Sequence, residues 1–102
     1  MAIKENHAGW LLHTTLVDSK GKNIDQQMYQ MGNSTDMLNL FLERKKTKKE
    51  WESDKSHIVS YHLHLMQIVS YGSAGVLIRD KATEEELTEY AKHEQALIDA
   101  QK

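Results

Sequence analysis

Six histidines are the residues of this 102-residue chain best suited to bind a metal ion or to move a proton near neutral pH. The pair His62 and His64 is the strongest candidate, because residues two apart share one face of a strand and can reach one metal ion. On a helix the same two side chains point about 200° apart. The surrounding residues favour a helix, as argued below. We therefore expect no metal site, no cofactor and no catalytic residue here.

Other signatures of catalysis are missing from the sequence. The chain has no cysteine, which excludes thiolate zinc sites, iron–sulfur clusters, disulfides and a cysteine nucleophile. The segment His13-Thr14-Thr15-Leu16 resembles half of the signature of the two-histidine phosphoesterases, and the second half does not occur in the chain. We therefore expect a protein that is not an enzyme.

A basic run is the second feature that could contact a ligand. Its residues, with a nearby tryptophan, are Arg44, Lys45, Lys46, Lys48, Lys49 and Trp51. Five positive charges could neutralise several phosphates of a nucleic acid, and the tryptophan could stack on a base. On a helix, however, these cations circle the axis, which is typical of a solvated helix end. An acidic run, Glu84–Glu89, could face the basic run within the fold or across a dimer.

The elements that position these residues begin with a β-hairpin. Trp10–Val17 is rich in β-branched and aromatic residues and is followed by a polar loop at Asp18–Asn23. Ile24–Met31 then returns as the second strand. We expect Ile24, Met28 and Tyr29 to be its packing residues.

Two helices are expected next. Residues 32–35 can cap a helix that starts near Asp36, is apolar at first and is almost wholly charged from Glu43 to Glu52. Asp54–Tyr71 predicts a second helix, because its polar residues recur every three or four positions. The polar face of this helix consists of Ser56, His57, Ser60, His64, Gln67 and Ser70, of which His57, Ser60, His64 and Gln67 are candidate contact residues. His57 and His64 lie roughly 10 Å apart along such a helix, too far for one ion.

The chain ends with a short strand and a third helix. Val76–Ile78 is apolar and bounded by Gly75 and Asp80, which predicts a buried strand near 76–79. Thr83-Glu84-Glu85-Glu86 is a capping box, which marks a helix start. The expected inner face of this helix is Leu87, Tyr90, Ala91, Leu97 and Ile98.

These elements predict one α+β domain over residues 1–102. A small antiparallel sheet, made of the N-terminal hairpin and the strand near 76–79, would pack against about three helices. An all-α bundle with a helical N-terminal region is the alternative.

Charge and hydropathy indicate which partners and which cellular compartment to expect. The formal charge is 13 − 15 = −2, which indicates neither a nucleic acid nor a membrane surface as partner. Ser56–Ile78 contains no charged residue other than histidine, yet its histidines, Gln67 and serines are costly in a bilayer. We expect no membrane span, and the start of the chain predicts a cytoplasmic protein.

The sequence therefore favours a small, non-enzymatic, intracellular protein-interaction module. It would be a homodimer without cofactor that acts as an inhibitor or accessory factor on a larger protein or complex, of the kind that phages and mobile elements encode. The alternative is a nucleic-acid-binding accessory protein that uses residues 44–49. A third interpretation is a histidine-dependent enzyme or metal protein that uses His13, His57 or His64.

Overall fold

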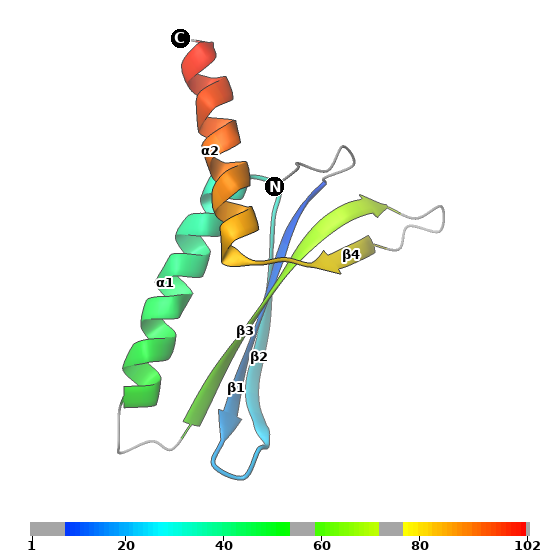
Figure 1. Ribbon diagram of the computed structural model, residues 1–102. Helices are drawn as coiled ribbons and strands as arrows, with labels where there is room; N and C mark the ends of the chain where they lie inside the picture. Colours follow the sequence, from blue (N-terminus) through cyan, green and yellow to red (C-terminus); the bar gives the residue numbers. More distant parts are fainter. Residues whose placement is uncertain (1–7, 54–58, 72–76, 102) are drawn as a thin grey trace.

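The computed structural model describes residues 8–53, 59–71 and 77–101, which form an α+β structure (Figure 1). The elements in chain order are β1 (Gly9–Asp18), β2 (Asn23–Met31), α1 (Ser34–Ser53), β3 (Val59–Tyr71), β4 (Leu77–Lys81) and α2 (Glu84–Ala100). The four strands form one antiparallel sheet in the order β2-β1-β3-β4. The α+β class is thus confirmed, whereas the all-α alternative is wrong.

The N-terminal hairpin is confirmed as β1 and β2. Asp18 organises the turn, because its Oδ1 atom accepts hydrogen bonds from the backbone N–H groups of Lys20 and Lys22, both at 2.9 Å. Gly21 closes the turn with φ +82°, a conformation that costs glycine little. At the other end of β1, Gly9 has φ +143°, and a Cβ there would meet the Met31 carbonyl oxygen at 2.8 Å.

The central strand β3 replaces the helix expected over Asp54–Tyr71, and the third helix is therefore absent from the described residues. β3 has β1 along one side and β4 along part of the other, so backbone pairing sets its conformation. Leu65 and Ile68 are buried on opposite faces of this strand. Ile68 is buried on the same face on which His62 and His64 are exposed, so apolar and polar residues do not alternate regularly along this strand. Its polar residues therefore had the spacing of three or four positions that is typical of a helix.

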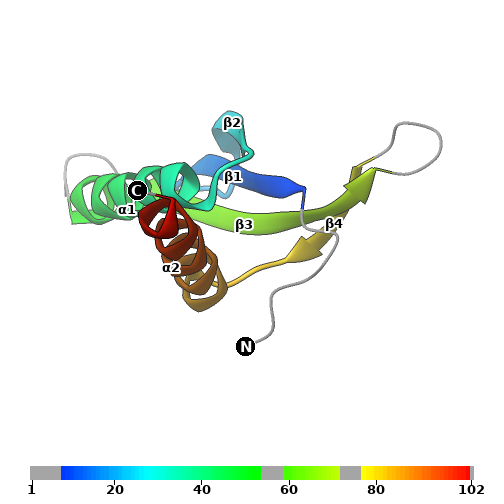
Figure 2. The same cartoon turned by 90° about the horizontal axis from the view of Figure 1, so that it is seen from above.

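Both helices pack on one face of the sheet. Trp10 and Leu12 of β1 share this face, which we call the helix face, and they form the core with residues of both helices. The members of the core are Trp10, Leu12, Met37, Leu65, Leu87 and Tyr90. Seen from above, β3 runs through the molecule from the α1 side toward β4 (Figure 2). Neither of the described helices lies on the opposite face of the sheet, which we call the open face.

Helix α2 starts as expected at the capping box of Thr83 and Glu86. Leu87 and Tyr90 are buried, but Leu97 and Ile98 are exposed, so the inner face expected for the second half of this helix is wrong. The physical reason is visible in Figure 1, where the end of α2 extends past the sheet and past the start of α1. Neither described helix combines the length and the apolar character needed to cross a bilayer.

Candidate functional site

The basic segment on α1 is largely engaged in contacts within the chain. The Arg44 guanidinium donates to the Tyr29 hydroxyl at 3.0 Å, and its Cζ atom lies 5.0 Å from the centre of the Tyr29 ring. Lys45 forms an ion pair with Glu84, with Nζ at 2.9 and 3.0 Å from the two carboxylate oxygens. The basic and acidic runs therefore meet within one chain at this pair.

Of the other residues of the basic run, one forms a hydrogen bond within the chain and the others are exposed to solvent. Lys48 donates to the Tyr61 carbonyl oxygen at 2.6 Å. Lys46 and Lys49 are exposed. Trp51 is exposed at the edge of a hollow of about 150 Å³ between α1 and the helix face, which Arg44 also lines. The cations thus do not form one continuous phosphate-binding stripe.

Side chains of α1 protect the outer edge of β3 where β4 does not cover it. Lys48 binds the carbonyl oxygen of Tyr61, and the backbone N–H of the same residue hydrogen-bonds the Glu52 carboxylate. The hydrogen bond from Lys48, with help from this N–H, lowers the pKa of Glu52, which keeps the carboxylate charged. Both backbone groups of Tyr61 are therefore occupied, and a further strand could not pair there without breaking these bonds.

The strand β4 completes this protected edge of the sheet. It has only five residues, Leu77–Lys81. The expectation of a buried strand near 76–79 is wrong as to burial, because this strand lies at the edge of the sheet and Ile78 is 48% exposed. Three of them are charged (Arg79, Asp80 and Lys81). Short, charged edge strands are a common means by which proteins prevent unwanted strand pairing.

The opposite edge, formed by β2, has none of these protections. β2 is nine residues long, and β1 is its only neighbour in the sheet. It contains no lysine, arginine or proline, and Asp25 is its one charged residue. Ile24 and Met28 are 55% and 53% exposed. The expectation that Ile24 and Met28 are packing residues of this strand is therefore wrong, whereas Tyr29 packs against the core as expected.

A sequence signal for this edge was present. Asp25-Gln26-Gln27 places polar residues on both faces of β2 in succession, which is typical of an edge strand and not of an inner one. The sequence could not show which of the two hairpin strands would take β3 as its second neighbour. Pairing of β1 with β3 left β2 outside.

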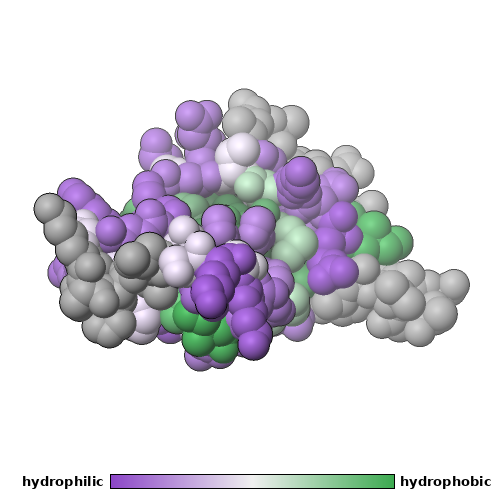
Figure 3. All heavy atoms as spheres, turned by 90° about the horizontal axis from the view of Figure 1, so that it is seen from below, coloured by the Kyte–Doolittle hydropathy of each residue, from purple (hydrophilic) through white to green (hydrophobic). Residues whose placement is uncertain are grey.

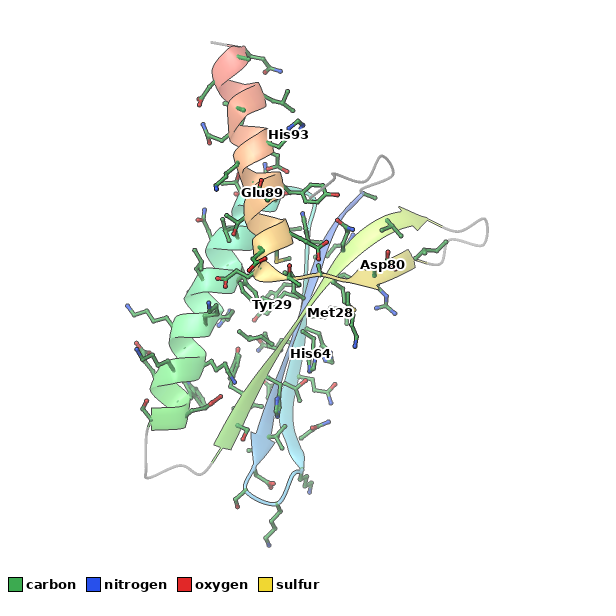
Figure 4. The ribbon with its side chains drawn as sticks, viewed as in Figure 1. Met28, Tyr29, His64, Asp80, Glu89 and His93 are labelled. Carbon is green, nitrogen blue, oxygen red and sulfur yellow. The ribbon has the colours of Figure 1, made fainter. Side chains whose placement is uncertain are left out.

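The open face brings together residues that the sequence separated. By strand register its central part consists of Thr15 and His13 of β1, Gln26 and Met28 of β2, and Ser60, His62 and His64 of β3. The rings of His13 and His64 have centres 6.0 Å apart, and those of His62 and His64 are 6.3 Å apart. Figure 4 shows Met28 and His64 near the middle of the sheet.

The expected polar helix face does not exist in this arrangement. Ser60 and His64 do share the open face, but Gln67 points to the helix face and is completely buried. His57 lies outside the described residues. His64 and Gln67 lie on opposite faces of the sheet because residues three apart on a strand point in opposite directions, whereas on a helix they are neighbours.

Within residues 8–53, 59–71 and 77–101, no three His, Asp or Glu side chains stand in an arrangement ready to hold a metal ion. The described surface seen from below is mostly hydrophilic, with hydrophobic side chains in separate small patches (Figure 3). Among the described strands, β2 has the longest edge that no other strand pairs with.

Comparison with known proteins identifies no relative of this chain: no family model, no curated protein and no solved structure matches it.

Proposed function

We propose that this protein is a non-enzymatic interaction module that binds an extended segment of a larger protein along the outer edge of β2. The observation that supports this proposal is the contrast between the two edges of the sheet. One edge is short, charged and contacted at Tyr61 by Lys48 and Glu52, whereas β2 is long, almost uncharged and not covered by any described strand. An unprotected edge of this length is a template for strand addition.

The residues of β2 indicate the kind of segment that would fit. A pairing strand would place side chains next to Met28 on the open face and next to the exposed Ile24 near the start of β2, which favours apolar residues at these two positions. On the helix face the neighbours are Asp25, Gln27 and Tyr29. A polar or basic side chain suits these positions, and a basic one would pair with Asp25. The expected ligand is thus a strand of alternating apolar and polar residues.

The test compares two matched pairs of substitutions in affinity capture from a host-cell lysate, with and without nuclease. Ile24→Lys/Met28→Lys places positive charge on the β2 edge, which disfavours strand addition. Leu42→Lys/Leu97→Lys is the control, because these side chains are similarly exposed, at 47% and 52%, and lie on helices. We expect a protein that survives nuclease to be captured by the native chain and by the control. The edge variant should recover roughly tenfold less, or about 1.4 kcal/mol of binding free energy.

Three results would contradict the proposal. The captured protein could be retained equally by the edge variant, which would move the interface elsewhere. Nucleic acid without a discrete protein could be recovered, which would favour the basic segment. Light scattering could also show a dimer that Ile24→Lys/Met28→Lys dissociates, with no other protein captured, which would assign the edge to a second copy of this chain.

A further inference from the structure

Three histidines meet on the open face at positions that adjacent strands hold side by side. His62 and His64 are two residues apart on β3, so both point to this face. His13 lies directly opposite His64 in the β1–β3 register. Side chains directly opposite each other in an antiparallel pair have Cβ atoms about 5 Å apart. The three imidazoles therefore belong to one cluster, with ring centres separated by 6.0 Å and 6.3 Å.

From this cluster we infer that His13, His62 and His64 form a binding site for a divalent transition metal ion of the zinc type. Imidazole nitrogens bind Zn²⁺ at about 2.0–2.1 Å. Three histidines with one open position are a common zinc ligand set. The inference does not depend on the proposed function of β2, because its three ligands lie on β1 and β3.

The three side chains must change rotamer to bind one ion, because in their present positions they do not form a metal-binding group. Rings that bind one tetrahedral ion have centres about 5 Å apart, given the usual Zn–N length. The separations of the His64 ring from those of His13 and His62 are about 1 Å larger, and the rings of His62 and His64 are inclined by only 28°. Their nitrogens therefore do not converge in the present rotamers. His62 and His64 are exposed and His13 is half-buried, so rotation about their side-chain bonds meets little packing.

The surroundings of the cluster are compatible with a metal ion that prefers nitrogen and sulfur ligands. Met28 lies opposite His13 on β2, so a thioether flanks the three imidazoles on the open face. Lys81 is the nearby cation on β4, and it lies opposite Met66, one position beyond the histidines on that face. Lys81 is exposed and can turn away from an incoming ion.

The test uses Zn²⁺ alone as the probe in isothermal titration calorimetry, and the visible absorption spectrum of bound Co²⁺ as a second readout. His13→Gln, His62→Gln and His64→Gln each remove one ligand. His93→Gln is the matched control, because His93 is exposed on α2 and lies apart from the cluster (Figure 4). We expect one Zn²⁺ per chain in the native protein and the control. Each cluster variant should bind about tenfold more weakly or worse.

Absence of Zn²⁺ binding by the native chain would overturn the inference, as would an unchanged affinity in the three cluster variants. An equal loss in His93→Gln would do the same, because it would indicate scattered surface binding. Far-ultraviolet circular dichroism establishes that the variants remain folded. If His13→Gln unfolds, the Zn²⁺ affinities of His62→Gln and His64→Gln still test the inference, because both of these side chains are exposed.

Discussion

At the scale of single residues, Gln67 combines complete burial with an unpaired amide. Its side chain is 0% exposed, and neither Nε2 nor Oε1 has a hydrogen-bond partner among the described residues. It lies on the helix face between Trp10 of β1 and Asp80 of β4. A buried polar group without a partner costs about 1–3 kcal/mol of folding free energy. Gln67 is therefore a source of instability within the core.

We predict that Gln67→Met stabilises the protein. Methionine has nearly the same length and flexibility as glutamine and needs no hydrogen bond. The free energy of unfolding should rise by about 1 kcal/mol, which raises the melting temperature by roughly 4–8 °C in a domain of this size. Thermal unfolding followed by circular dichroism measures the change. Gln30→Met, at an exposed position of β2, is the control and should have little effect. A lower melting temperature for Gln67→Met would show that the amide is needed.

The proposed metal site depends on the conformation of the chain as well as on the presence of histidines. His62 and His64 have the same sequence spacing on a helix and on a strand, but only a strand puts them on one face. The metal site proposed for them therefore follows from the conformation of β3 and from the pairing of His13 with His64.

At the scale of elements, the start of α1 is held by a side chain from α2. Glu94 accepts hydrogen bonds from the backbone N–H groups of Ser34 and Thr35, at 2.7 and 3.1 Å, and from the Thr35 hydroxyl at 3.3 Å. Asn33 accepts a further bond from the Asp36 N–H at 3.0 Å. These bonds satisfy N–H groups of the first turn, and the carboxylate lies at the positive end of the helix dipole.

The same contacts determine the charge state of Glu94. Burial by itself would raise the pKa of this carboxyl group, but the hydrogen bonds from Ser34 and Thr35 outweigh it and lower the pKa below its ordinary value of 4.5. Because the folded-state pKa is lower than the unfolded-state value, the charged carboxylate stabilises the fold fully above about pH 4.5. This stabilisation is lost as the pH falls through the folded-state pKa.

We therefore predict that Glu94→Gln lowers the free energy of unfolding by about 1–2 kcal/mol at pH 7. The difference from the native protein should shrink as the pH falls below 4.5, where the native carboxyl group also becomes neutral. Urea unfolding at a series of pH values measures both effects. Glu89→Gln is the control, because Glu89 is exposed and forms a long ion pair of 3.8 Å with the exposed Lys92. A difference that did not depend on pH would contradict this account.

At the scale of the whole molecule, the distribution of charge opposes binding to nucleic acid. The formal charge is −2. Three of the five cations in the basic segment, Arg44, Lys45 and Lys48, contact Tyr29, Glu84, Glu52 or the Tyr61 backbone. Release of counterions from nucleic acid requires several cations that are free to face phosphates. Within the basic segment, Lys46 and Lys49 are the exposed cations that take no part in these contacts, and two cations are few for binding to phosphates.

We accordingly predict no salt-dependent binding of a DNA or RNA duplex at physiological ionic strength. An electrophoretic mobility shift over a range of salt concentrations measures it. Lys46→Glu/Lys49→Glu should behave like the native chain, with a matched Lys20→Glu/Lys22→Glu variant in the β1–β2 turn as the control. Binding that weakens with salt and disappears only in Lys46→Glu/Lys49→Glu would restore the nucleic-acid interpretation.

The two edges of the sheet are also a property of the whole molecule. Helix α1 contributes Lys48 and Glu52 to one edge, and no described element performs this role at β2. The edge at which another chain could pair therefore depends on the placement of α1 as much as on the residues of β2.

Several elements could be recognised from local sequence. The hairpin turn at Asp18–Lys22 and the capping box at Thr83 and Glu86 agree with the structure. The short strand is also present, as Leu77–Lys81, although it is an exposed edge strand and not the buried strand expected near 76–79. Their signals act within a few residues, since turn residues and helix caps bond to backbone groups close by in the chain. The sequence also predicted that the basic run and the acidic run could face each other, either within the fold or across a dimer. The ion pair between Lys45 and Glu84 is a contact of the first kind, within one chain.

The remaining features depended on segments distant in sequence. Whether Val59–Tyr71 became a helix or a strand was decided by β1 and β4, which supply its hydrogen-bond partners. The same pairing left β2 at the edge, buried Gln67 and placed His13 opposite His64. Helical hydrogen bonds form within one segment, but a strand is stable only with a neighbour, so tertiary pairing had to decide these positions.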